Sequence, residues 1–278
     1  MERAAKVMLT DDCITREMAI HGTVWASAHG GYFADPQVAR PLVEAAVGTV
    51  RSSAPEVIVD LGGGTGYLLG QLMNDLPDPA LHFVNVELSP RQLGGDHHPR
   101  VHKVCCGLTE FQREIVGGSD RRVLFLMRSV LHYFGKDHLP EALTAIRGHL
   151  RPGEYFVHQS ACFDDPGDAE CLNQLYADMH SPKHYPTTSV LRDLLEKAGF
   201  AVESIEPGPP LPLDSAELAR RYQIGGADMD RIQVRLAERF GRIDQVFEPA
   251  SDGFRAWLHY RIFIGRATDL TRGNTDTQ

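Results

Sequence analysis

The stretch VIVDLGGGTGYLLGQL, residues 57–72, constrains the fold more than any other part of the chain. Three β-branched apolar residues lead into Asp60, and apolar residues return with helical spacing after the glycines. Glycine loses more backbone entropy on folding than any other residue, but it adopts positive φ and lets a ligand lie against bare main chain. We therefore expect a ligand-binding turn between the first strand and the first helix of a βαβ unit. Its glycines are Gly62, Gly63, Gly64 and Gly66.

Two common nucleotide-binding signatures fail at this turn. The phosphate-loop form requires Lys-Ser/Thr after its last glycine, whereas Tyr67 and Leu68 follow Gly66. The dinucleotide form G-x-G-x-x-G lacks its third glycine from either starting point, because Tyr67 or Leu69 occupies that place. The pattern that remains is D-x-G-x-G-x-G, which begins at Asp60.

After residue 55, short apolar runs alternate with helical patterns, which is typical of a parallel sheet covered on both faces. A helix over TTSVLRDLLEKAGF ends at Gly199 and precedes a strand, AVESIE. We expect the earlier helices near Tyr67–Leu76, Thr109–Ile115 and Pro140–Leu150. We expect the earlier strands at Val57–Asp60, Leu81–Glu87, Val101–Cys106, Val123–Met127 and Tyr155–His158.

The chain divides into three parts by this pattern. Residues 1–55 are expected to form an N-terminal helical arm or lid, in which Pro41–Val50 is a helix with proline in its first turn. Residues 56–267 are the core, ending in a strand at Trp257–Ala267, and residues 268–278 a flexible tail. An inserted cap segment, 207–254, begins with the proline-rich break PGPPLPLD and continues with two helices.

Composition narrows the partners and the compartment. Acidic residues outnumber basic ones, 37 to 28, and the net charge of -9 disfavours a broad nucleic-acid surface. The sequence has no apolar run of the ~20 residues that a membrane span needs, and its charged N-terminus argues against a secretory signal. Five cysteines, an odd number, fit a reduced cytoplasm better than a disulfide scaffold. The sequence leaves a homodimer open.

The glycine pattern resembles the first motif of class I S-adenosylmethionine-dependent methyltransferases. A second matching feature is Glu87, which ends the next strand 21 positions after Gly66. The resemblance covers residues 40–205 and the last strand. It implies an α/β fold, namely a Rossmann-like, seven-stranded, mostly parallel sheet with an antiparallel last strand and helices on both faces. It also implies S-adenosylmethionine as the cofactor and a small molecule as the acceptor.

The resemblance also implies roles around the cofactor. The glycine loop would lie against the methionine and ribose, Glu87 would accept the ribose hydroxyls, and Asp60 would orient the loop or contact the ammonium group. Many members carry an acid after the third strand for adenine, whereas this chain has Cys106 and Gly107. Adenine would then be held by backbone, by apolar contacts or by Thr109. Met127 and Arg128 would line the cofactor pocket, and Tyr32 would cover the cofactor or simply pack against Phe33.

Methyl transfer from a sulfonium is an in-line displacement, so the enzyme mainly supplies alignment and a desolvated site. A general base helps when the acceptor is a hydroxyl. The segment FLMRSVLHYF resembles the LHDW segment of small-molecule O-methyltransferases and places His132 at the position of their base. The alternative is that His132 buttresses the cofactor loop. By the same comparison, acceptor contacts are expected from Tyr176, Met179, His180 and His184.

No catalytic metal is predicted. His180 and His184 are four residues apart, but Pro182 would break a helix that joined them. The expected function is transfer of a methyl group to a small molecule, with oxygen as the favoured acceptor atom and nitrogen or carbon as alternatives. A protein that binds S-adenosylmethionine without transferring its methyl group is a further alternative. The acidic balance and the absence of an N/D-P-P-Y/F tetrad argue against a nucleic-acid or protein methyltransferase.

Overall fold

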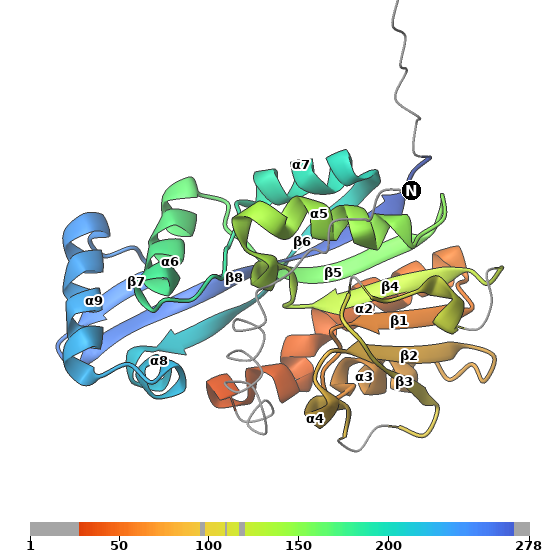
Figure 1. The fold of residues 1–278 in the computed structure, drawn as a ribbon, viewed down its shortest axis with the longest axis horizontal. Helices are drawn as coiled ribbons and strands as arrows, with labels where there is room; N and C mark the ends of the chain where they lie inside the picture. The colour runs from red at the N-terminus through yellow and green to blue at the C-terminus, as the bar shows by residue number, and fades with distance from the viewer. Residues whose placement is uncertain (1–27, 95–97, 109, 117–119, 270–278) are drawn as a thin grey trace, which may run out of the picture.

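The computed structural model describes residues 28–94, 98–108, 110–116 and 120–269. Their strands form one eight-stranded sheet with the order β3-β2-β1-β4-β5-β8-β6, and β7 pairs with β8 (Figure 1). The first five strands are parallel to one another, and β8 is antiparallel to both β5 and β6. This confirms the predicted Rossmann-like sheet, with β7 as an extra strand. The strands are β1 (Val57–Leu61), β2 (His82–Glu87), β3 (Val101–Cys105), β4 (Val123–Arg128), β5 (Tyr155–Ala161), β6 (Phe200–Asp214), β7 (Phe247–Ala250) and β8 (Gly253–Ala267).

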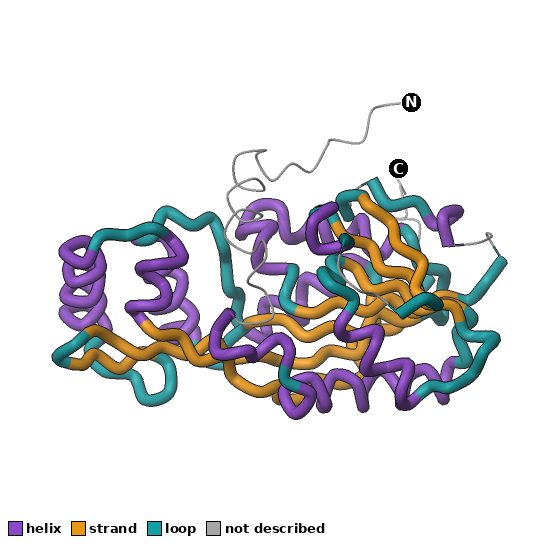
Figure 2. Tube along the Cα trace, turned by 90° about the horizontal axis from the view of Figure 1, so that it is seen from below, coloured by secondary structure: helices purple, strands orange, loops and turns teal. Residues whose placement is uncertain are grey.

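Helices cover both faces of the parallel part of the sheet, as Figure 2 shows edge-on. The short 3₁₀ helices are η1 (Ala28–Ala34), η2 (Arg113–Val116) and η3 (Leu131–Phe134). The α-helices are α2 (Pro36–Ser53), α3 (Tyr67–Asp75), α4 (Pro90–Leu93), α5 (Gly135–Gly148), α6 (Pro166–Asp178), α7 (Thr188–Ala198), α8 (Ser215–Tyr222) and α9 (Gly226–Phe240).

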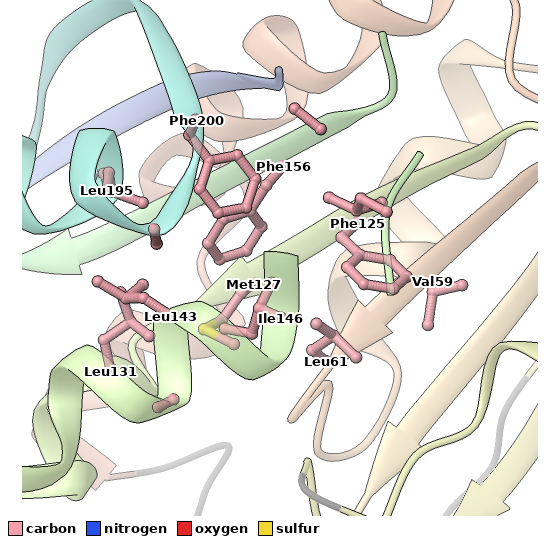
Figure 3. Close-up of a cluster of buried hydrophobic side chains, with 14 of the residues drawn as sticks. Val59, Leu61, Phe125, Met127, Leu131, Leu143, Ile146, Phe156, Leu195 and Phe200 are labelled. Carbon is pink, nitrogen blue, oxygen red and sulfur yellow. The ribbon is translucent and has the colours of Figure 1, made fainter. Parts of the chain in front are cut away.

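Side chains alternate between the two faces of the sheet along each strand, so the hydrophobic interior of the parallel part has two layers, one on each face. Val57, Val59 and Leu61 of β1 pack with α5 and α7 in one hydrophobic cluster, part of which Figure 3 shows. Ile58, between them, packs on the opposite face with α2 and α3. Successive side chains of a strand point to opposite faces, so a strand that is buried on both reads as a continuous apolar run. That is why these strands were predictable from sequence.

The predicted proline-rich break is wrong: the structure runs β6 straight through it, as far as Asp214. β6 is an edge strand that pairs only with β8, and its register shifts between Gly208 and Leu211. Proline has no N–H to donate to a neighbouring strand. An edge strand can place prolines on the side that has no partner strand, and a bulge accommodates prolines that face the paired side. Pro207, where the inserted segment was predicted to begin, therefore lies inside a strand.

The distal ends of β6 and β8 carry a second lobe, which we call the cap and which lies to the left in Figure 1. It comprises α6, α8, α9, β7 and those strand ends, and it has a hydrophobic cluster of its own. The two predicted helices of the inserted segment are present as α8 and α9. Apolar side chains of α6 and of the β6–β8 ribbon complete the cluster, so the cap is tied to the core by continuous strands.

Two further helix predictions need correction. The first described α-helix begins at Pro36, after the Asp35 cap, so Pro41 lies inside it rather than in its first turn. The helix predicted near Thr109–Ile115 is only the four-residue η2, and Thr109 lies outside the described residues. Most of the arm (1–27) and of the tail (270–278) also lies outside them.

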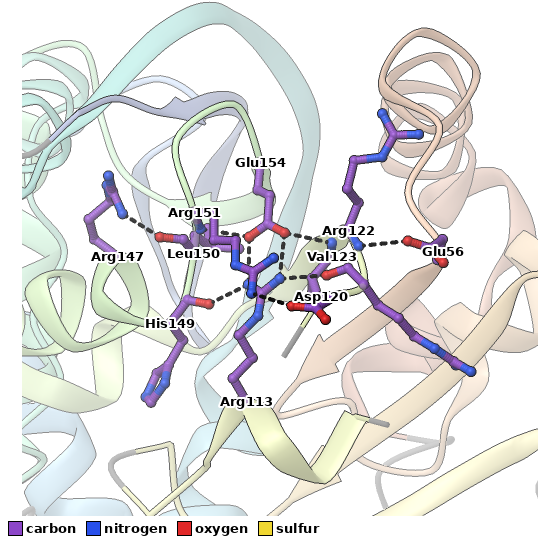
Figure 4. A network of polar contacts seen from close by, with 11 residues as sticks. Glu56, Arg113, Asp120, Arg122, Val123, Arg147, His149, Leu150, Arg151 and Glu154 are labelled. Atoms are coloured by element: carbon purple, nitrogen blue, oxygen red, sulfur yellow. Dashed lines mark hydrogen bonds and ion pairs between the residues drawn. The ribbon is translucent and has the colours of Figure 1, made fainter. Parts of the chain in front are cut away.

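A buried ion pair between Arg113 and Glu154 lies at the amino ends of β4 and β5 (Figure 4). Both oxygens of Glu154 accept bonds of 2.6 Å from Arg113, and they also accept the backbone N–H groups of Val123 and Arg151. Arg113 in turn donates to the carbonyls of His149 and Arg121. The carboxylate is 5% exposed, and its four accepted bonds compensate the charge in a site that water hardly reaches.

None of the helices in the described part of the chain combines the length and the apolar character needed to cross a bilayer.

Candidate functional site

The glycine loop joins β1 to α3 at the carboxyl edge of the sheet, where α/β proteins bind ligands. Gly62, Gly64 and Gly66 have φ of 73°, 55° and 76°, a region that side chains strongly disfavour. Gly63 is required for space, because a Cβ there would overlap Asn85 Oδ1 and Asp60 Oδ2. The loop is therefore bare backbone by necessity.

The loop is anchored to β2. The N–H groups of Gly62 and Gly63 donate to Val86 O at 2.7 and 3.3 Å, and the N–H of Gly64 donates to Glu87 Oε2 at 2.9 Å. Asn85 Nδ2 donates to Gly64 O at 3.0 Å. These three N–H groups hold the loop against β2, so the loop keeps its shape before a ligand binds.

Glu87 stands beside the loop at the end of β2. Its second oxygen accepts the N–H of Ser89 at 2.8 Å, so backbone donors hold both oxygens. Burial raises its pKa, while the backbone bonds from Ser89, Gly64 and Leu88 oppose the shift. A carboxylate has about four acceptor positions, so acceptor capacity remains for a sugar hydroxyl.

Asp60 is the least satisfied group at this edge. It is 1% exposed, and neither of its carboxylate oxygens has a hydrogen-bond partner among the described residues. Burial raises its pKa to about 7, with a smaller contribution from Glu87, while Arg128 lowers it. A buried carboxylate without donors costs stability, so this position suits a cationic ligand group.

Arg128, at the end of β4, is the cation of the same edge. Its Nη1 donates to Phe33 O at 3.2 Å, whereas Nε and Nη2 are buried without a partner among the described residues. Burial lowers its pKa, while nearby acidic groups, Asp60 among them, oppose the shift. Asp60 and Arg128 thus present opposite charges, which matches an amino acid's ammonium and carboxylate groups. By contrast, the side chain of Met127 lies in the hydrophobic core (Figure 3).

Tyr32 brings the N-terminal arm onto the edge of the sheet. Its ring stacks on Tyr260 at 6.0 Å and contacts Phe33, and the guanidinium of Arg128 lies over both arm rings. Its hydroxyl donates to Pro209 O at 2.5 Å. Burial raises the pKa of Tyr32. The structure therefore shows the predicted packing of Tyr32 against Phe33 and places Tyr32 next to Arg128, while its contact with the cofactor stays a prediction.

Cys106 and Gly107 follow β3, the strand that pairs with β2 and therefore ends next to Glu87. Cys106 packs partly against the core, and burial raises its thiol pKa. The N–H of Gly107 donates to Glu110 Oε2 at 3.2 Å. An acid is thus present after β3, a few residues beyond the expected position.

His132 sits in η3, just beyond β4, and is buried. Its ring lies 4.1 Å from that of Tyr133 and 5.4 Å from that of Tyr185. Tyr185 contacts Tyr176, one of the predicted acceptor residues, at 5.0 Å. His132 therefore belongs to a group of contacting aromatic rings that extends through Tyr185 to Tyr176 in the cap.

The other predicted acceptor residues are dispersed. Met179 is buried in the cap cluster, His184 is half-buried with its pKa lowered by burial, and His180 is exposed. Met179 and His180 line a cavity of about 440 Å³ with the α8–α9 turn. No residue of the glycine loop, β4 or β5 lines this cavity, so it belongs to the cap.

Comparisons with known proteins agree with this geometry. Residues 33–205 match the family model described as a methyltransferase domain. The chain belongs to this methyltransferase family. The match confirms the class predicted from the glycine loop, the S-adenosylmethionine-dependent methyltransferases.

Solved structures support the fold of the methyltransferase. YcgJ from Bacillus subtilis superposes with a TM-score of 0.59 at 12% identity, over 83% of this chain and 99% of that one. A Burkholderia thailandensis 1,6-didemethyltoxoflavin-N1-methyltransferase, solved with that compound and S-adenosylhomocysteine, gives a TM-score of 0.52 at 17% identity, over 97% and 99% of the two chains.

A curated relative is the 3-amino-4-hydroxybenzoate 4-O-methyltransferase of Streptomyces cremeus, which is 28% identical over 178 residues. The alignment covers 60% of this chain, and the methyltransferase spans 46% of that relative's length.

Several residues of the site had no sequence signal. Lys183 and Tyr185 come from the loop between α6 and α7, and Tyr222 comes from the end of α8. Gln159, on β5, is fully buried; its Nε2 contacts the Tyr32 hydroxyl at 3.4 Å, and its Oε1 has no partner among the described residues. Only the position of Gln159 at the carboxyl end of a predicted strand could have drawn attention to it. Among the described residues, no three His, Cys, Asp or Glu side chains of the methyltransferase gather as a metal site.

Proposed function

We propose that this methyltransferase transfers the methyl group of S-adenosylmethionine to a hydroxyl of a small aromatic acceptor. The observation that carries the proposal is the place of His132: its imidazole is buried among aromatic rings, just beyond the strand that ends in Arg128. A proton acceptor in an aromatic enclosure beside the cofactor loop suits O-methylation better than a site without a base.

The residues of the carboxyl edge fit the cofactor. Asp60 suits the ammonium group, Arg128 suits the carboxylate, and Glu87 suits the two ribose hydroxyls, while the bare loop accommodates the chain between them. When bound, S-adenosylmethionine supplies a methyl group on a positively charged sulfur. The protein's part is to align an acceptor oxygen with that group and to keep water out.

His132 would accept the acceptor's hydroxyl proton as the oxygen attacks. Tyr133 and Tyr185 both contact the imidazole, which restricts its motion before an acceptor arrives. The same rings would stack on an aromatic acceptor. The Streptomyces relative named above is an O-methyltransferase of a hydroxybenzoate, which supports an oxygen acceptor. The Burkholderia enzyme, an N1-methyltransferase, makes nitrogen the second candidate.

The test is S-adenosylhomocysteine release with a panel of phenols, hydroxybenzoates and matched anilines. His132→Gln should lower kcat for a phenolic acceptor by about 10²- to 10⁴-fold, the usual contribution of a positioned base. Its affinity for S-adenosylhomocysteine, measured by calorimetry, should stay unchanged. His138→Gln, a change at an exposed histidine of α5, is the matched control and should keep full activity.

Two outcomes would contradict the proposal. Turnover of anilines but not phenols would move the acceptor atom to nitrogen. Unchanged turnover in His132→Gln would remove the histidine from the chemistry and leave it a structural role.

A further inference from the structure

We propose that Lys183 recognises a carboxylate on the aromatic acceptor, so that the acceptor is a hydroxylated aromatic acid held between His132 and Lys183. The inference rests on the proposed function and specifies its substrate class. It is carried by the environment of the lysine, which no sequence motif marked.

Lys183 is fixed beside the base by the loop that contains it. The N–H of His184 donates to His132 O at 3.1 Å, and Pro182 O would lie 3.3 Å from a Cβ at Gly135, whose φ of +66° also favours glycine. The ring of Tyr185, from the same loop, lies 5.4 Å from the imidazole and is tilted by 33° to it. The loop between α6 and α7 and the η3 turn therefore form one packed unit.

The side chain of Lys183 is buried in a cage of tyrosines. It is 8% exposed, and its Nζ lies 4.9, 5.5 and 5.3 Å from the ring centres of Tyr133, Tyr176 and Tyr222. It donates to the Tyr222 hydroxyl at 2.6 Å. Aromatic faces stabilise a cation without neutralising it, and removal from water strengthens its interaction with an anion.

The position of this charge relative to the base sets the kind of acceptor. The imidazole centre of His132 lies 4.1 Å and the Nζ of Lys183 4.9 Å from the centre of the same Tyr133 ring, so the base and the cation are neighbours. A hydroxybenzoate carries the two matching groups on one ring, a hydroxyl and a carboxylate. In this arrangement the carboxylate binds Lys183, the ring packs against tyrosines, and the hydroxyl meets His132.

The experiment compares an acid with its neutral amide. The probes are 3-amino-4-hydroxybenzoate and 3-amino-4-hydroxybenzamide, which differ only in the group expected at Lys183. The wild type should favour the acid in kcat/KM by about 30- to 100-fold, the usual value of a desolvated charge pair. Lys183→Met should bring the ratio close to one by lowering activity on the acid alone, while Lys183→Arg should keep most of the preference.

Two controls separate recognition from folding. Lys136→Met, a change at an exposed lysine of α5, should leave the preference intact. Each variant should keep the wild-type melting temperature within a few degrees and its affinity for S-adenosylhomocysteine. A calorimetric titration of the acid into protein saturated with S-adenosylhomocysteine gives a readout independent of turnover, and Lys183→Met should weaken it by a similar factor.

The failures are distinguishable. Equal use of acid and amide by the wild type, or an equal loss on both in Lys183→Met, would overturn the role of Lys183 and leave the proposed O-methylation standing. Turnover of neutral phenols with no turnover of either probe would do the same. If no member of the full acceptor panel is methylated by protein that binds S-adenosylhomocysteine, the proposed function fails and the inference fails with it.

Discussion

The two ends of the parallel strands each hold a buried carboxylate, and the two carboxylates differ in the hydrogen bonds that they accept. At the amino edge, Glu154 accepts four hydrogen bonds, two of them from Arg113. At the carboxyl edge, Asp60 is buried more deeply and has no hydrogen-bond partner among the described residues. A satisfied buried charge maintains the fold, whereas an unsatisfied one marks a place where a ligand completes the structure. The contrast separates residues kept for stability from residues kept for binding.

Removing the satisfied carboxylate should have the largest effect on stability. Glu154→Gln leaves the guanidinium of Arg113 buried without its counter-charge, so the free energy of unfolding should fall by about 3–5 kcal/mol. Urea denaturation measures it. Glu203→Gln, which breaks the exposed pair with Arg266, is the control and should cost less than about 1 kcal/mol. A loss no greater than in this control would show that the amino-edge network is not a structural clamp.

Removing the unsatisfied carboxylate should weaken cofactor binding without harming the fold. Asp60→Asn should lower the affinity for S-adenosylhomocysteine by about 10- to 100-fold, because a charged hydrogen bond to the ammonium is lost. The apo protein should unfold no more easily, and at pH 8 it should gain about 1–3 kcal/mol. Calorimetry and denaturation of the same preparation test both halves. Loss of stability with normal binding would reverse the assignment of the two edges.

The pH dependence follows from the same residue. The pKa of Asp60 is raised to about 7, so between pH 4 and 7 the folded state keeps a proton that the unfolded state has lost. Stability from this group is therefore present at pH 4 and disappears as pH rises through 7. The difference in unfolding free energy between wild type and Asp60→Asn should grow over this range. A difference that stays constant with pH would contradict the raised pKa.

Glu87 should give an intermediate result, because two backbone bonds already fix it. Glu87→Gln keeps an acceptor for the loop but loses the charge, so S-adenosylhomocysteine affinity should fall by about tenfold. Comparing this loss of affinity with the loss in Asp60→Asn shows which of the two carboxylates contributes more to S-adenosylhomocysteine binding. Unchanged affinity would remove the ribose role from Glu87.

The smallest effect is expected where the arm meets β6. Tyr32→Phe removes the hydroxyl bonded to Pro209 O but keeps the ring stacked on Tyr260, so unfolding free energy should fall by about 0.5–1.5 kcal/mol. Thermal denaturation checks it. A loss above about 3 kcal/mol would mean that the arm belongs to the core rather than lying over it.

The sequence predicted what depends on local pattern. The glycine loop, the first five strands and the placement of Glu87 follow from periodicity and spacing within short windows. The course of β6 does not, because prolines are acceptable only once the strand is known to lie at the sheet edge, and that depends on pairing with β8 some fifty residues later. The start of α6 was readable in principle, since Asp165 caps it and Pro166 fills its first turn.

The unpredicted site residues share one physical reason. Lys183 and Tyr185 occupy a loop, and their place beside His132 results from the packing of that loop on η3. Arg113 and Glu154 are 41 positions apart and meet only because η2 packs against the start of β5. No periodicity records contacts of this kind, so the sequence predicted the glycine loop and its flanking strands better than the surroundings of His132.

The continuous β6–β8 ribbon has a consequence for redesigning acceptor choice. A junction at residue 207 would cut β6 in its middle, among residues that pair with β8. Junctions at Asp214 and Gly253 lie at the end of the β6–β8 ladder and leave it whole, although β7 would then have to pair with the β8 of the host. Grafts made there would transplant α8, α9 and β7, and with them Tyr222, while Lys183, Tyr133 and Tyr185 stay with the host.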